Sequence, residues 1–307
     1  MTSANATFPW KGEKRHWRDR LIAWGARKIA QPRLASPAPW AAHRRGFELS
    51  AGLRRFSKAR GVAVQKISLG PLGALEIAPP SPERRLIWVH GGGFVVGSPE
   101  THLVMLSHLS RVANALIIAP RYRLAPEDPF PAGPDDVEAA VPEALAWRSD
   151  IGPCVLGGDS AGGCLALVAL QKLLRDGTAP AATLLFSPAT IVDPDRPVPD
   201  ADDLLFPEEV LQRIGESYAG HADSNDPRLS PVHGNYEGAP PTMIQCVSRE
   251  FLEEDSDAIA ARIQAHGGPV TLEKVTRMPH VWQFMAGSSP LADAAIRRAA
   301  DFMRAHA

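Results

Sequence analysis

The sequence predicts an α/β fold in which helices flank a mostly parallel central sheet, and which carries a helical cap. From about residue 61 onward, short apolar runs typical of buried strands alternate with longer segments whose apolar residues recur at helical spacing. Two of the short runs end abruptly in glycine-rich turns. With 307 residues and 45% hydrophobic content, the chain is long enough for one large domain and a smaller appendage.

The N-terminal 60 residues are predicted to form a helical cap ahead of the α/β domain, which spans residues 61–307. A first helix is expected over residues 8–30 and a second over residues 41–58, with the prolines at 32, 37 and 39 ending the first. The first helix places four apolar residues close to one face: Trp10, Trp17, Leu21 and Trp24. This stripe either packs the helix onto the body of the protein or forms a lid over a binding site.

The elements of the α/β domain follow from the apolar runs. Strands are expected at residues 74–78, 86–89, 115–119, 154–156, 183–186, 243–247 and 270–275. Helices are expected at residues 101–112, 135–147, 161–174, 208–218, 256–265 and 291–305. The segment at about 190–222 is too long for an ordinary connection, so we expect it to fold over the strand ends as a second part of the cap.

The first functional signal is the stretch Cys154-Val-Leu-Gly-Gly-Asp-Ser-Ala-Gly-Gly163. Its centre, residues 158–162, fits G-x-S-x-G, in which the glycines permit a sharp strand-to-helix turn that exposes the serine hydroxyl. We therefore predict that Ser160 is a nucleophile. The pentapeptide alone is also compatible with an ordinary turn of an α/β protein.

A second glycine run, His90-Gly-Gly-Gly-Phe94, directly follows the strand predicted at residues 86–89. Glycines free backbone N–H groups to face a ligand, and such donors stabilise the oxyanion of acyl transfer by about 3 kcal/mol each. We predict an oxyanion hole made by the N–H groups of Gly92, Gly93 and Ala161. A phosphate-binding loop is disfavoured, because neither G-x-x-x-x-G-K-[ST] nor a helix-opening G-x-G-x-x-G is present here.

The chain resembles the hormone-sensitive-lipase-like branch of the α/β-hydrolase superfamily, which contains many bacterial carboxylesterases. Besides the two glycine motifs, the similar stretches are Tyr122-Arg-Leu-Ala-Pro-Glu-Asp-Pro-Phe-Pro131, Ser187-Pro188 and Met278-Pro-His280. The resemblance extends from about residue 60 to the C-terminus, and the N-terminal part is similar to that family's lid in composition only. It implies an α/β-hydrolase fold, a Ser-acid-His triad, an oxyanion hole from the HGGG segment and no cofactor.

The histidine and the acid of such a triad follow the serine along the chain. His280 matches the family's histidine, although His-Val-Trp stands where His-Gly-Phe is common. The acid departs from the family, because an ungapped alignment places Arg249 at the usual aspartate. Glu250 is the nearest replacement and is the predicted acid, with Asp255 as the second candidate. A triad without an acid is a third alternative.

The other carboxylates and histidines of this region are expected to have ordinary structural roles. Four carboxylates are expected to be solvated charges at the start of the helix after Glu250: Glu253, Glu254, Asp255 and Asp257. His90 is expected to support the glycine loop. The remaining histidines lack paired ligand spacing, so we predict no metal site and expect surface or polar contacts for His16, His43, His102, His108, His221, His233, His266 and His306.

Composition excludes several classes of partner. With 33 Lys and Arg against 34 Asp and Glu, there is no electrostatic reason to expect nucleic acid, and no concentrated basic block is expected to bind a membrane surface. Three cysteines in apolar segments, Cys154, Cys164 and Cys246, are expected to be buried and reduced. Together with the lack of a signal peptide or a membrane-spanning run, they predict a cytoplasmic protein. A homodimer is left open.

These inferences predict a serine carboxylesterase for short to medium acyl esters, in which Ser160 attacks, His280 is the base and Glu250 orients His280. Four aromatic residues are expected to line a modest substrate pocket: Phe94, Trp282, Trp17 and Trp24. Lactones, acetylated compounds and carbamates are alternative substrates. Arg249 also raises a different hypothesis, a small-molecule receptor on a catalytically impaired hydrolase.

Overall fold

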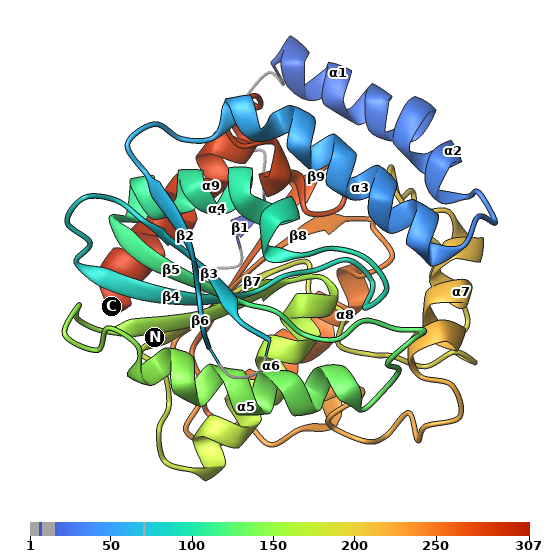
Figure 1. The fold of residues 1–307 in the computed structure, drawn as a ribbon. Helices are drawn as coiled ribbons and strands as arrows, with labels where there is room; N and C mark the ends of the chain where they lie inside the picture. The colour runs from blue at the N-terminus through green and yellow to red at the C-terminus, as the bar shows by residue number, and fades with distance from the viewer. Residues whose placement is uncertain (1–5, 8–15, 70–71) are drawn as a thin grey trace.

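The computed structural model has a nine-stranded sheet at its centre, in the order β1-β9-β8-β7-β6-β4-β5-β3-β2 (Figure 1). The structure describes residues 6–7, 16–69 and 72–307. Strand β3 pairs antiparallel with β2 and β5, and the other neighbours are parallel. The strands are β1 (Ala6–Thr7), β2 (Ala63–Ile67), β3 (Ala74–Ala78), β4 (Arg84–Val89), β5 (Ala115–Pro120), β6 (Cys154–Asp159), β7 (Ala182–Phe186), β8 (Thr242–Ser248) and β9 (Val270–Thr276).

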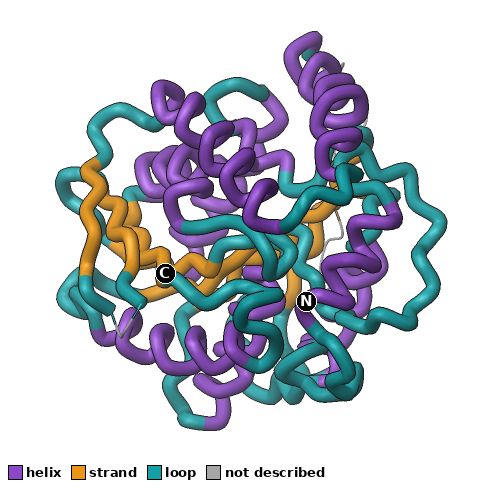
Figure 2. Tube along the Cα trace, turned by 45° about the vertical axis from the view of Figure 1, so that its right-hand side comes forward, coloured by secondary structure: helices purple, strands orange, loops and turns teal. Residues whose placement is uncertain are grey.

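Helices cover both faces of this sheet, as the strands between helical layers in Figure 2 show. One layer consists of α4 (Pro99–Ala113) and α9 (Pro290–His306), and the other of α5 (Ala132–Ala146), α6 (Ala161–Arg175) and α8 (Glu253–Ala265). Alternate side chains of β4 enter opposite cores, with Leu86 and Trp88 in one and Ile87 and Val89 in the other. A strand buried on both faces reads as a continuous apolar run, which is why the sequence revealed it.

The strands and helices expected from residue 74 onward are confirmed, with ends that differ by a few residues. The sequence did not predict β2, because this edge strand mixes polar and apolar residues and most of its side chains are exposed. It also did not predict the two-residue strand β1.

The N-terminal helices differ from the expectation at Pro32. Helix α1 (Trp17–Gly25) continues through a π-helical turn, η1 (Ala26–Ala30), into α2 (Gln31–Leu34), and α3 (Trp40–Arg54) follows. Pro32 therefore does not end the helix; it stands in the first turn of α2, a position at which helices tolerate proline. Residues 8–15 of the predicted helix, with Trp10, lie outside the described residues.

The N-terminal helices contact α7 (Glu208–Tyr218) and the loop before it. Trp40 donates its indole N–H to Oγ of Ser217 at 2.9 Å, and the guanidinium of Arg213 lies 4.0 Å from the centre of the Trp40 ring. The side-chain amide of Gln31 donates to the carbonyls of Asp203 and Phe206 at 3.2 and 3.3 Å. Two segments far apart in sequence are thereby joined beside the sheet (Figure 1).

The three cysteines are all buried and free, as expected. Burial raises the pKa of Cys154 to about 12, so its thiol is protonated at neutral pH. Within the part of the chain that the structure describes, no helix combines the length and apolar character needed to cross a membrane.

Candidate active site

Ser160 occupies a strained turn between β6 and α6. Its backbone has φ 52° and ψ −124°, a conformation rarely taken by residues other than glycine. The Ser160 amide donates to the carbonyl of Phe186 at 2.9 Å, which fixes the turn against the neighbouring strand. A Cβ on Gly162 would clash with the carbonyl oxygens of Val89 and His90, so the turn requires glycine there. The side chain of Ser160 thus stands where β6 ends.

His280 and Glu250 lie next to each other, 30 residues apart in sequence. Nδ1 of His280 is 2.7 Å from Oε2 of Glu250, and both side chains are buried. The other carboxylate oxygen of Glu250 accepts the N–H of Val247 at 2.9 Å, so the carboxylate is held from both ends. Nε2 of His280 is buried and has no hydrogen-bond partner among the described residues, which leaves this atom for proton transfer.

The electrostatics of this pair favour a charged imidazole. Burial lowers the pKa of His280, but the carboxylate of Glu250, helped by those of Asp203 and Asp159, raises it by more, so the pKa lies above the usual value for histidine. A histidine with this environment is a stronger base than an isolated one. The carboxylate of Glu250 stabilises the imidazolium that forms when a nucleophile gives its proton to His280.

Arg249 is turned away from this pair. Its backbone has φ 66°, and its side chain lies near the surface, 3.7 Å from the carboxylate of the exposed Asp200. Its N–H donates to Oε2 of Glu253 at 2.6 Å. The arginine at the usual aspartate position therefore does not oppose the imidazolium. Arg249 thus gives no support to the hypothesis of a catalytically impaired receptor.

The expectation that Asp255 is a solvated charge is wrong. Its side chain is fully buried, and Oδ2 accepts the N–H groups of Thr190 and Ile191 at 2.7 and 2.9 Å. Its other oxygen is 2.5 Å from Arg196. Asp255 thus ties the 190–222 segment to α8 and is not directed at His280. Three neighbouring carboxylates form ion pairs with Lys274 or Arg196: Glu253, Glu254 and Asp257.

The glycine loop after β4 and the turn after β6 present three N–H groups that donate to no partner within the described chain: those of Gly92, Gly93 and Ala161. Gly92 has φ 124°, and a Cβ there would clash with the carbonyl of Val96, so only glycine allows this fold of the loop. The Gly92 carbonyl accepts the N–H groups of Val95 and Val96 at 3.1 and 3.0 Å, which closes the turn. The two loops that carry the three N–H groups follow the neighbouring strands β4 and β6.

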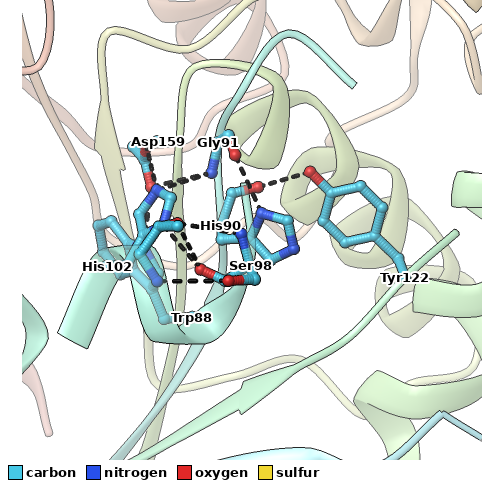
Figure 3. Close-up of polar contacts among 8 residues, drawn as sticks. Trp88, His90, Gly91, Ser98, His102, Tyr122 and Asp159 are labelled. Atoms are coloured by element: carbon cyan, nitrogen blue, oxygen red, sulfur yellow. Dashed lines mark hydrogen bonds and ion pairs between the residues drawn. The ribbon is translucent and has the colours of Figure 1, made fainter. Parts of the chain in front are cut away.

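A buried polar network, drawn in Figure 3, holds the start of this loop in place. Oδ1 of Asp159 accepts the indole N–H of Trp88 at 2.9 Å and the N–H of Gly91 at 3.2 Å. Oδ2 lies 3.1 Å from Nε2 of His102. Burial raises the pKa of Asp159, but His102 and Trp88 outweigh it, so the pKa is below its usual range and the carboxylate is charged. The network holds Gly91, immediately before the loop's N–H groups.

His90 supports the same loop from its other side (Figure 3). Its ring stacks on Tyr122 with centroids 4.3 Å apart, and its Nδ1 lies 2.9 Å from the Gly91 carbonyl. The hydroxyl of Tyr122 donates to the His90 carbonyl at 2.8 Å. The sequence anticipated this role for His90, but it gave no indication of the contact between His102 and Asp159. Only the position of Asp159 inside the G-x-S-x-G motif could have suggested it.

The four aromatic residues expected in a substrate pocket have different surroundings. Trp17 and Trp24 are 62% and 54% exposed, so neither side chain is packed into the body of the protein, and their place at a substrate pocket stays a prediction. Trp282 is buried in a small core cluster with residues of β8 and β9, two residues after His280, and its role in the pocket also stays a prediction. Phe94 is buried, and its ring stacks on Tyr218 at 3.7 Å.

Two apolar residues that the sequence did not single out approach the site from the 190–222 segment. The ring of Phe206 lies 5.0 Å from that of His280, edge to face. A Cβ on Gly93 would be 2.7 Å from Cδ1 of Ile214, so this side chain contacts the glycine loop. The described residues contain no group of three or more His, Cys, Asp or Glu side chains placed to hold a metal ion.

The chain is similar to several known proteins. A family model described as alpha/beta hydrolase fold matches residues 86–284. The chain belongs to this family. An acetyl-hydrolase of Streptomyces hygroscopicus is 37% identical over 72% of this chain and 75% of its own. Esterase LipI of Mycobacterium tuberculosis is 30% identical over 75% and 76%.

Solved structures narrow the assignment within this α/β-hydrolase family. The crystal structure of an esterase from the bacterial hormone-sensitive lipase family superposes with a TM-score of 0.84 at 31% identity, covering 96% of this chain and 99% of that one. This α/β hydrolase is therefore a member of the hormone-sensitive-lipase-like branch and a carboxylic ester hydrolase.

Proposed function

We propose that this hydrolase cleaves short to medium acyl esters through a triad of Ser160, His280 and Glu250 and an acyl-enzyme intermediate. The observation that carries the proposal is the 2.7 Å contact between Nδ1 of His280 and Oε2 of Glu250. It orients the imidazole so that its other nitrogen, Nε2, is left without a partner among the residues described. A buried imidazole arranged in this way is what general-base activation of a serine requires.

The proposed reaction begins when Oγ of Ser160 attacks the ester carbonyl and Nε2 of His280 takes the hydroxyl proton. The negative charge on the carbonyl oxygen is stabilised by the N–H groups of the oxyanion hole: Gly92, Gly93 and Ala161. His280 then returns the proton to the departing alkoxide, leaving Ser160 acylated. Water repeats both steps and releases the acid, while Glu250 stabilises the imidazolium each time.

We propose that the N-terminal 60 residues and the segment at about 190–222 together form the cap of the catalytic domain at residues 61–307. The contacts of Trp40 with Ser217 and of Gln31 with Phe206 support this division. Phe206 and Ile214 bring apolar side chains toward the site, which suits a small apolar acyl group. The acetyl-hydrolase relative acts on a short acyl group by its name, which points the same way.

Hydrolysis of p-nitrophenyl esters from acetate to palmitate tests the proposal. We expect the highest kcat/KM at short to medium acyl length and the loss of nearly all turnover in Ser160→Ala, with circular dichroism unchanged. Asp128→Asn, which alters a partly exposed carboxylate, is the matched control and should keep full activity. Equal activity of Ser160→Ala and the control would contradict the nucleophile assignment, and a maximum at palmitate would contradict the acyl preference.

A further inference from the structure

The N-terminal helices carry the exposed apolar surface of this protein. Helix α1 exposes Trp17, Leu21 and Trp24, and α3 with the turn after it exposes Leu49, Leu53 and Phe56, with Ile29 between them. Each triplet has the spacing i, i+4, i+7, so each forms a stripe along one helix face. Among residues 16–69 and 72–307, these are all the large apolar side chains that are exposed, and Phe56 reaches 97%.

The same segment is strongly basic. Residues 16–60 hold eleven of the 33 Lys and Arg but only two of the 34 Asp and Glu, so their formal charge is +9 and that of the remaining chain is −10. One of the two acids, Asp19, is buried. Seven exposed basic side chains make no ion pair with any described residue: Arg18, Arg20, Lys28, Arg33, Arg45, Arg55 and Arg60. The near-zero net charge of the whole chain conceals this segregation.

The stripes face away from the body of the enzyme. Helix α3 packs its opposite side on the body, where the ring of Phe47 contacts those of His102 and Phe284 with centroids 6.4 and 6.2 Å away. Helix α1 also lies on the outer side of the molecule (Figure 1). Exposed aromatic and aliphatic residues beside unpaired basic residues are the combination that interfacial helices use.

We propose that the surface formed by α1 and α3 docks on an anionic lipid surface. Tryptophan and leucine side chains enter the boundary between headgroups and acyl chains, while Lys and Arg side chains are attracted to anionic headgroups by about 1 kcal/mol each. A symmetric pairing of two copies through this surface would instead bring two segments of charge +9 together. The charge therefore favours the lipid surface over a second copy of the chain. This proposal departs from the expectation, drawn from the sequence, that the protein has no membrane partner.

Docking would place the glycine loop close to the lipid. Arg44 of α3 donates to the carbonyl of Val95 at 2.7 Å and forms an ion pair with Glu127 at 2.6 Å. Val95 directly follows the loop whose N–H groups are free, so the docking helix contacts the chain beside this loop. Only this consequence rests on the proposed function, since lipid binding itself needs no catalytic residue.

Co-sedimentation of the full chain with phosphatidylserine-rich vesicles and with pure phosphatidylcholine vesicles tests the proposal. We expect binding to the anionic vesicles that weakens at high salt. The charge variant Arg18→Gln/Arg20→Gln/Lys28→Gln and the apolar variant Leu49→Ser/Leu53→Ser/Phe56→Ser should each bind at least about tenfold more weakly. The matched control Arg148→Gln/Lys172→Gln/Arg175→Gln removes three basic charges outside the segment and should bind as the wild type does.

Hydrolysis of p-nitrophenyl butyrate in solution should be unchanged in the charge and apolar variants, which shows that they fold. Failure of the wild-type protein to bind the anionic vesicles, or binding of the variants as tight as that of the control, would overturn the proposal.

Analytical ultracentrifugation tests whether a second copy of the chain covers this surface instead. If the wild type is an oligomer that the apolar variant converts to a monomer, and neither binds vesicles, the surface joins copies of the chain and the lipid proposal is wrong. Failure of Ser160→Ala to lose activity would bear only on the catalytic proposal.

Discussion

Neighbouring residues in the loop after β8 have opposite surroundings, and the backbone explains the difference. At Arg249 the chain turns through a left-handed conformation with φ 66°, which directs this side chain to the surface. The next side chain, Glu250, then points inward to His280 and is only 3% exposed. The carboxylate of Glu250 is held beside the imidazole because its other oxygen accepts the N–H of Val247.

The Glu250→Gln variant tests the role of this charge. The amide keeps the shape of the side chain but removes the negative charge, so the imidazolium loses its stabilisation and the wrong tautomer is favoured. We expect kcat to fall by about 10³ to 10⁴, the size of the equivalent change in a serine protease. The pKa of His280, now raised by Glu250, should fall, so the acidic limb of the kcat/KM profile should move to lower pH.

Arg249→Gln is the matched control for that variant, because it changes the adjacent side chain, which is exposed and turned away from His280. It should keep the wild-type turnover and pH profile. If Glu250→Gln loses activity without a shift of the acidic limb, Glu250 is a structural residue and not the partner of His280 in catalysis.

Helix α1 is anchored to α9 by one buried carboxylate. Asp19 is 1% exposed, and its Oδ1 accepts the Ser289 hydroxyl at 2.5 Å and the Leu291 N–H at 3.4 Å. Ser289 is the N-cap of α9 and itself accepts the N–H of Ala292 at 3.1 Å. A negative charge at a helix N-terminus also interacts favourably with the helix dipole. This buried carboxylate thus helps to hold α1 on the domain, beside Ile22, which packs against a core cluster.

Asp19→Ala should lower the free energy of unfolding by about 1–3 kcal/mol, because it leaves the buried Ser289 hydroxyl without its acceptor and removes the charge at the start of α9. Urea denaturation followed by circular dichroism measures the change. Glu48→Ala removes the other acid of residues 16–60, which is exposed, and should stay within about 0.5 kcal/mol of the wild type. Similar values for the two variants would show that Asp19 does not anchor α1.

Stability of the whole molecule should depend on pH through His90, which lies in the interior where β4 meets the glycine loop. Burial lowers the pKa of His90 to about 3, while in the unfolded chain it titrates near the ordinary value of 6.5. Above pH 6.5 neither state binds this proton. Below it the unfolded state does and the folded state does not, so stability is lost as pH falls from about 6.5 toward 3.

The His90→Asn variant, which keeps an N–H group near the Gly91 carbonyl, isolates this effect. We expect the difference in unfolding free energy between wild type and variant to change by about 1.4 kcal/mol per pH unit between pH 6 and pH 4.5, in the direction that favours the variant at low pH. Urea titrations across this range measure it. Parallel stability curves for the two proteins would show that His90 takes up its proton equally in both states.

Local rules were sufficient for the sheet and for much of the candidate site. Strand β4 is buried on both faces, so its residues form an unbroken apolar run that can be recognised without any knowledge of its neighbours. The turn around Ser160 and the loop around Gly92 need glycines for steric reasons confined to a few residues. A short motif suggested Ser160, whereas His280 and Glu250 could be predicted as its partners only by adding the family resemblance to the chain order of a triad.

Packing between distant segments was needed for the rest. The burial of Asp255 depends on the N–H groups of Thr190 and Ile191, more than 60 residues away, and the contact of His102 with Asp159 spans 57 residues. The outward direction of Trp17 and Trp24 depends on which face of α1 meets α9. Helical periodicity groups side chains on one face, but it does not say whether that face meets protein or solvent, because burial is a property of the assembled layers.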